Sequence, residues 1–426
     1  MKTLSSNDTV SAGFKGATWD PGRMPEGVSA SPQVLRTSDG ATVTGLLYSR
    51  GGEQTVVAVM HPREFTIGHY VIPEVLRAGC ACWMQASRSP GNDLRLEHEL
   101  TLLDVAAGVG FLREQGFPSV VLLGNSGGAG LFTFYNQQAL LEPGERISHT
   151  PSGRPTKLSK ASMPVPDGMI LLAPHPGQGK LLMNSIDPSL TEESDPLSLD
   201  PSLSPFDSAN GFNTPPNSSS YAPEFVTRYR AGQRDRVARI DSICRDLIAD
   251  RKHAREQLIT SSDHAIKVRA AHRPIFTVWR TDADLRCFDL SMDPSERSYG
   301  SLWGKNPLSS NYGSVGFARV CTPESWLSTW SGLTSNAALA KTLPSIEQPT
   351  LFLGYTGDNS VFPGDARVLF DSIGSSDKTE HWVRGTHHGR PLAPDEISGR
   401  ILAGERISDW LAERFVVMSD ADRGGK

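Results

Sequence analysis

The stretch Ser119–Tyr135, SVVLLGNSGGAGLFTFY, decides the fold of this chain. Its first half is an apolar run with β-branched members at residues 120–123, which is typical of a strand buried on both faces. A glycine-rich segment follows at once, and a region rich in Leu, Phe and Ala then predicts a helix. The chain therefore passes from strand to helix through a tight turn, with Ser126 at the apex and Gly124 and Gly128 on either side.

The spacing G-x-S-x-G has a chemical reason. A serine in a strained turn can present its Oγ above the edge of a sheet only if its neighbours lack a Cβ that would clash. The N-terminus of the new helix then directs free N–H groups, and the positive end of the helix dipole, at any oxyanion that forms there. A phosphate-gripping turn is the alternative, and the absence of G-x-G-x-x-G or G-K-[ST] disfavours it.

This segment resembles the nucleophile elbow of the α/β-hydrolase superfamily. The likeness covers roughly residues 31–177 and 348–416, where GNSGG and the strand end APHPG lie, and the motif SWLSTW further along adds to it. The whole chain is similar to a bacterial group of esterase- or lipase-like serine hydrolases with a large inserted lid and no assigned substrate. The resemblance implies an α/β-hydrolase fold, which is a doubly wound, mostly parallel sheet with a large inserted lid.

The residues support the same fold class independently. Strand-like runs alternate with helix-like segments at residues 55–60, 81–86, 120–123, 169–173 and 350–353. Such alternation predicts an α/β protein with a parallel sheet covered on both faces. Ligands of these sheets bind beyond the C-terminal ends of the strands. His61, Arg88, Ser126 and His175 all follow strand ends, so we expect them near one crevice.

The alternation stops after Gly177 and resumes only at Thr350, which divides the chain. Residues 1–30 are predicted to be an N-terminal surface segment, residues 31–177 and 349–426 the hydrolase core, and residues 178–348 an inserted lid. The lid region is rich in aromatic residues between 275 and 330. Because aromatic side chains over a crevice supply contact area at a low cost in entropy, we expect a hydrophobic or aromatic small-molecule substrate.

A serine becomes a nucleophile when a base removes its proton and an acid orients that base. In α/β-hydrolases the chain order is Ser, acid, His, and this sequence supplies that order. The acid that the resemblance selects is Asp358 in D-N-S-V-F-P, with Asp365 as the alternative in the following helix. His387 and His388 are adjacent in W-V-R-G-T-H-H-G. The resemblance favours His388, the third residue after glycine, as the base and leaves His387 open.

Two N–H donors are expected to bind the oxyanion. Gly127, the residue after the nucleophile, should supply one of them. The other comes, in the family, from the loop after the strand that here ends at Met60. Carrying that position over selects the backbone of Arg63, although Pro62 stands where the family has glycine. No H-x-E or H-E-x-x-H spacing occurs, so neither a metal nor a cofactor is predicted.

These residues predict a serine hydrolase that cleaves a carboxylic ester or lactone of a hydrophobic small molecule through an acyl-enzyme. Hydrolysis of a C–C bond or a thioester stays open, because the same triad serves both. The alternative from a different functional class is a binding protein that has the same fold but no catalytic activity. It is disfavoured because the chain keeps a candidate for every member of the triad.

Composition narrows the choice of partners. The formal net charge is −5, so the chain has no basic excess of the kind that nucleic acids or anionic membranes attract. The five cysteines are scattered without a C-x-x-C pair, which is typical of reduced thiols in a cytoplasmic protein. No apolar run is long enough to cross a bilayer. The sequence leaves open whether the protein is a homodimer.

Overall fold

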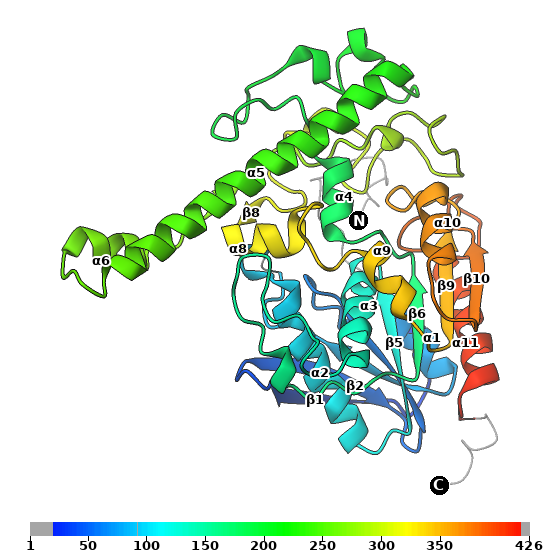
Figure 1. Ribbon diagram of the computed structural model, residues 1–426. Coiled ribbons are helices and arrows are strands. Elements are labelled where there is room, and N and C mark those ends of the chain that lie inside the picture. Colours follow the sequence, from blue (N-terminus) through cyan, green and yellow to red (C-terminus); the bar gives the residue numbers. More distant parts are fainter. Residues whose placement is uncertain (1–19, 92, 419–426) are drawn as a thin grey trace, which may run out of the picture. The chain divides into compact units, whose positions relative to one another are not determined.

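The structure is a computed structural model that describes residues 20–91 and 93–418. Its central element is an eight-stranded sheet with the order β1-β2-β4-β3-β5-β6-β9-β10 (Figure 1). The strands are β1 (Ser29–Arg36), β2 (Thr42–Ser49), β3 (Thr55–Met60), β4 (Ala81–Gln85), β5 (Ser119–Asn125), β6 (Gly168–Leu172), β9 (Thr350–Tyr355) and β10 (Lys378–Val383). Most of the N-terminal surface segment expected at residues 1–30 lies outside the described residues.

The sheet is mostly parallel. β1 pairs with β2, and β2 with β4, in antiparallel register, whereas every pair from β4 across to β10 is parallel. Parallel neighbours cannot be joined by a hairpin and need a crossover, which the intervening helices provide. This strand order and these directions are those of the α/β-hydrolase fold. The doubly wound, mostly parallel sheet predicted from the sequence is therefore confirmed.

The chain forms two compact units. One comprises residues 20–91, 96–178 and 336–418 and contains the sheet; the other comprises residues 93–95 and 179–335. The sheet unit thus resumes at residue 336, before the boundary that the sequence suggests. Its helices are α1 (Val71–Arg77), α2 (His98–Glu114), α3 (Gly127–Leu140), α9 (Leu339–Thr342), α10 (Pro363–Asp371) and α11 (Gly399–Arg414).

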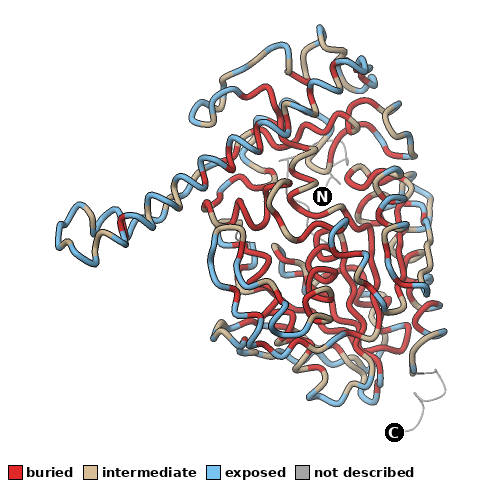
Figure 2. The backbone as a smooth tube through the Cα atoms, in the orientation of Figure 1, coloured by how far each residue is buried: buried red, intermediate tan, exposed pale blue. Residues whose placement is uncertain are grey.

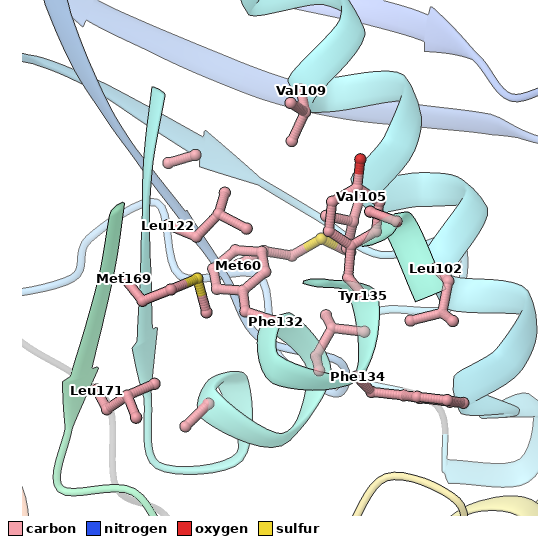
Figure 3. Close-up of a cluster of buried hydrophobic side chains, with 14 of the residues drawn as sticks. Met60, Leu102, Val105, Val109, Leu122, Phe132, Phe134, Tyr135, Met169 and Leu171 are labelled. Carbon is pink, nitrogen blue, oxygen red and sulfur yellow. The ribbon is translucent and has the colours of Figure 1, made fainter. Parts of the chain in front are cut away.

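Helices cover both faces of the sheet because its central strands are apolar on both sides. All residues of β3 are buried. Figure 2 shows buried backbone, in red, through the interior of the sheet unit. On one face, strand residues such as Met60 and Leu122 pack against Val105 of α2 and Phe132 of α3 (Figure 3). The alternate strand residues contribute to a second cluster with α1 and α11. The two clusters hold the strand ends, and the loops that follow them, in fixed positions.

The other unit has a core of its own. Its helices are α5 (Pro223–Gln257), α6 (His264–Ala271), α7 (Pro307–Asn311) and α8 (Pro323–Ser325), with α4 (Gln178–Ser185) at the boundary and a small β7–β8 pair (Phe276–Thr277, Val320–Cys321). A stripe on α5 that includes Val237, Ile240 and Cys244 packs with Trp326 and Trp330. These tryptophans therefore belong to the core of this unit. The expectation that residues 178–348 form a lid over the crevice stays a prediction.

Two further observations concern the described residues. None of their helices combines the length and the apolar character needed to cross a bilayer, and the longest, α5, is heavily charged. All five cysteines are buried and unbridged.

Candidate active site

Ser126 occupies the turn between β5 and α3 in a strained backbone conformation. Its φ is +53° and its ψ is −116°, a region that residues with a Cβ rarely adopt. The flanking glycines allow the turn to close. A Cβ on Gly124 would lie 2.5 Å from the backbone nitrogen of Ala129, and one on Gly128 would lie 2.6 Å from the carbonyl oxygen of Met60. The strand–turn–helix predicted from the sequence is present, with the serine at its apex.

A histidine and an aspartate complete a hydrogen-bonded row with this serine. His387 Nε2 lies 2.9 Å from Ser126 Oγ, and His387 Nδ1 lies 2.7 Å from Asp358 Oδ2. The other carboxylate oxygen, Asp358 Oδ1, accepts hydrogen bonds from the backbone N–H groups of Ser360 at 2.7 Å and Val361 at 2.9 Å. Both Asp358 and His387 are buried, whereas Ser126 keeps some exposed surface. The carboxylate is thus held in place, and it orients the imidazole toward the serine.

The structure corrects the choice between the adjacent histidines. His388, which the sequence favours, is not the residue between Ser126 and Asp358; His387 is. The ring of His388 instead packs edge-on against that of His387, with 4.7 Å between ring centroids. Its backbone carbonyl accepts a hydrogen bond from Arg400 Nε at 2.9 Å. The direction of each side chain follows from how the turn is anchored, and a count of residues from the glycine does not reveal it.

The expected acid lies where the sequence suggests. Asp358 follows the end of β9 and contacts His387, whereas the alternative, Asp365, lies in the first turn of α10. The first expected oxyanion donor, Gly127, is the first residue of α3. The backbone N–H groups of a first helical turn have no carbonyl acceptor within their own helix, so that of Gly127 can face a ligand.

The second expected donor needs a correction. The backbone N–H of Arg63 donates to Nδ1 of His61 at 3.2 Å, and the N–H of Glu64 donates to the same atom at 3.2 Å. The loop after β3 therefore wraps around the His61 imidazole. Pro62, where the resemblance leads us to expect a glycine, lies within this loop. Because the Arg63 amide is already engaged, the structure does not support it as an oxyanion donor.

Three polar side chains gather over Gly127 instead. A Cβ placed on this glycine would lie 2.7 Å from Nε2 of His61, 2.8 Å from Nε2 of Gln178 and 3.2 Å from Nε2 of His175. Gln178 is buried, and neither polar atom of its carboxamide has a hydrogen-bond partner among the described residues. His61 and His175 each follow a strand end in the sequence, and this is why the sequence predicts them at the crevice. Nothing in the sequence singled out Gln178.

Both histidines of this group are neutral. Burial of the ring, reinforced by Arg63 and His69, lowers the pKa of His61 to about 3. Burial, followed by the proximity of His387, holds the pKa of His175 well below its usual range. The group is therefore polar but carries no positive charge near neutral pH.

A further histidine, His69, contacts the residue that precedes Ser126. His69 Nδ1 accepts a hydrogen bond from the backbone N–H of Val71 at 3.2 Å, and its Nε2 lies 3.1 Å from Asn125 Oδ1. Asn125 Nδ2 in turn donates to the carbonyl oxygen of Leu172 at 2.9 Å. Burial lowers the pKa of His69 to about 4, so this ring is neutral as well. The chain of hydrogen bonds fixes the residue that precedes Ser126.

The described residues were also compared with the arrangements that hold metal ions. No group of three or more His, Cys, Asp or Glu residues within 20–91 and 93–418 is arranged to hold a metal ion.

Comparisons with known proteins gave likenesses to solved structures only. No family model matches the chain, and no curated protein matches it. The chain is similar to DcsB, whose structure was solved with a substrate analogue, at 10% identity and a TM-score of 0.49, over 91% of this chain and 100% of that one. It is similar to the esterase Pf2001 of Pyrococcus furiosus at 11% identity and a TM-score of 0.41, over 95% and 100%. It is also similar to the alpha/beta hydrolase GrgF of Penicillium sp. at 12% identity and a TM-score of 0.46, over 91% and 99%.

Proposed function

We propose that this protein, whose chain has the α/β-hydrolase fold, is a serine hydrolase that cleaves a carboxylic ester or lactone through an acyl-enzyme. The observation that carries the proposal is the row Ser126–His387–Asp358, with 2.9 Å between Oγ and Nε2 and 2.7 Å between Nδ1 and Oδ2. A nucleophile within hydrogen-bond reach of a base, itself oriented by an acid, is the arrangement that activates a serine.

The residues act in a defined order. His387 Nε2 takes the proton of Ser126 as Oγ attacks the carbonyl carbon of the substrate. Asp358 holds the imidazolium that results, and the N–H of Gly127 stabilises the oxyanion of the tetrahedral intermediate. His387 then returns the proton to the leaving alcohol, which leaves an acyl group on Ser126. A water molecule activated by His387 hydrolyses this acyl-enzyme and restores the serine.

The test is covalent labelling combined with turnover. Wild-type protein should react with a fluorophosphonate probe and hydrolyse p-nitrophenyl esters, and Ser126→Ala should abolish labelling. We expect the same substitution to lower kcat by on the order of a million-fold, as the loss of a triad serine does elsewhere. Ser31→Ala, which changes an exposed serine of β1, is the matched control and should behave as wild type.

Two outcomes would contradict the proposal. Residual activity of Ser126→Ala within tenfold of wild type would remove the assignment of the nucleophile. Wild-type protein that is neither labelled nor active on any ester would favour the silent binding protein.

A series of esters from acetate to decanoate also tests the apolar substrate predicted from the sequence.

A further inference from the structure

The group over Gly127 carries an inference that rests on the proposed serine-hydrolase function. We propose that the oxyanion of the intermediate is held by the N–H of Gly127 together with the side-chain N–H groups of His61 and Gln178. These side chains would take the place of the second backbone amide that the fold ordinarily supplies.

His61 carries its ring proton on Nε2, the nitrogen that faces Gly127. Its Nδ1 accepts hydrogen bonds from the backbone N–H groups of Arg63 and Glu64, both at 3.2 Å, and an accepting ring nitrogen carries no proton. Because the ring is neutral, its single proton must be on Nε2. That nitrogen lies 2.7 Å from the Cβ position of Gly127. The loop after β3 therefore presents a donor to the site through an imidazole.

Gln178 provides the second side-chain donor. Its side chain is 2% exposed, and both polar atoms lack a hydrogen-bond partner among residues 20–91 and 93–418. A buried amide without partners destabilises the folded protein, so its retention calls for an explanation. Its Nε2 lies 2.8 Å from the Cβ position of Gly127, beside the His61 donor. An oxygen atom of a bound substrate would supply the missing acceptor.

His175 strengthens the donor character of the group. Its Nδ1 accepts a hydrogen bond from the backbone N–H of Gly177 at 3.1 Å, so the proton of this neutral ring is also on Nε2. The three nitrogens around Gly127 are thus all donors. A side chain at position 127 would collide with them, which explains why the residue after the nucleophile is glycine. Neutral donors fixed before the reaction suit an oxygen whose negative charge develops only in the transition state.

A pair of substitutions separates this role from a structural one. In His61→Gln, the side-chain nitrogen can reach the position of Nε2 and keeps the donor. In His61→Asn, the side-chain oxygen takes the position of Nδ1 and keeps the acceptor for the loop but loses the donor. We expect His61→Asn to lower kcat by on the order of 100-fold with KM little changed, the cost of one oxyanion donor. His61→Gln should stay within about tenfold of wild type, and His149→Asn, at an exposed histidine, is the control.

Gln178→Met provides a second, independent measurement. It should lower kcat by on the order of 100-fold and weaken the inhibition constant of a trifluoromethyl ketone, which forms a tetrahedral adduct with the serine, by a similar factor. Because it removes an unsatisfied buried amide, it should leave the midpoint of thermal unfolding unchanged or raise it. Gln137→Met, at a half-buried glutamine on α3 whose side chain donates to the carbonyl oxygen of Lys341 at 2.9 Å, is the matched control. It should leave kcat and the inhibition constant unchanged and should lower the midpoint of thermal unfolding, because it removes a hydrogen bond.

The outcomes distinguish this inference from the proposed function. If Ser126→Ala is inactive while His61→Asn and Gln178→Met stay within threefold of wild type, the side-chain oxyanion hole is wrong and the serine hydrolase stands. An active His61→Asn with an inactive His61→Gln would assign His61 to the loop structure and would also overturn the inference. If wild-type protein is inactive on every ester, the proposed serine-hydrolase function is wrong, and the oxyanion hole that rests on it is wrong as well. Should His61→Asn not fold, the trifluoromethyl ketone affinity of Gln178→Met decides the question.

Discussion

At the scale of single residues, two adjacent histidines have different surroundings. His387 is enclosed between Asp358 and Ser126, whereas the backbone of His388 is tied to Arg400. The guanidinium of Arg400 also lies 4.9 Å from the ring centroid of Tyr70. This contact fixes the arginine, and through it the turn that carries both histidines. The turn therefore selects which imidazole faces the serine.

Substitution of each histidine tests this assignment. We expect His387→Ala to lower kcat/KM on an activated ester by at least about 10⁴-fold, because Ser126 then has no base. His388→Ala should cost no more than about tenfold, through a small displacement of its neighbour. Steady-state kinetics on both variants provides the measurement. A severe loss that follows His388→Ala instead would reverse the assignment.

At the scale of elements, the turn between β5 and α3 is built on close backbone approaches. Gly124 and Gly128 stand where added Cβ atoms would lie within 2.6 Å of backbone atoms. Backbone cannot rotate away as a side chain can, so these positions do not tolerate a larger residue. By contrast, Gly110 in α2 has no atom within 4 Å of its Cβ position.

Two glycine substitutions should therefore have opposite effects. Gly124→Ala should destabilise the protein by about 1–3 kcal/mol, because overpacking forces strand and helix apart. Gly110→Ala should stabilise it by about 0.5–1 kcal/mol, since alanine favours a helix interior. Urea unfolding of both variants gives the free energy of unfolding. Equal effects of the two would show that the turn is not packed as described.

At the scale of the whole molecule, the loops that follow the strands of the sheet unit carry several neutral histidines. His69 and His175 are each 3% exposed, and burial lowers the pKa of both below the usual value of 6.5. A histidine whose folded pKa is lowered binds a proton more readily in the unfolded chain. Its contribution to stability is therefore complete above about pH 6.5 and is lost as the pH falls toward the folded pKa.

This linkage predicts acid sensitivity. The free energy of unfolding should fall between pH 6.5 and about pH 4, with up to about 1.4 kcal/mol per pH unit from each such histidine. His69→Gln keeps a hydrogen-bonding side chain and does not titrate, so it should flatten the slope by about that amount. Urea unfolding at pH 7, 6 and 5 measures it. An unchanged slope in His69→Gln would mean that this ring is already protonated in the folded state.

The sequence by itself determined the features that depend on local pattern. The apolar run before Ser126 and the glycines around it specify a buried strand, a turn without Cβ clashes and a helix. The alternation of strands and helices determined the parallel sheet, and Asp358 follows its strand in the expected motif. Each of these signals lies within a few neighbouring residues, where periodicity and steric limits act directly.

Only the tertiary structure decided which groups meet. His387 rather than His388 faces the serine because hydrogen bonds from Arg400 and within the turn set the direction of each side chain. His61, Gln178 and Gly127 come from three separate segments, and the order of the strands in the sheet brings them together. The Arg63 amide is lost as a donor because the loop closes on the His61 ring. Side-chain direction and long-range proximity arise from packing, and no local pattern of residues records them.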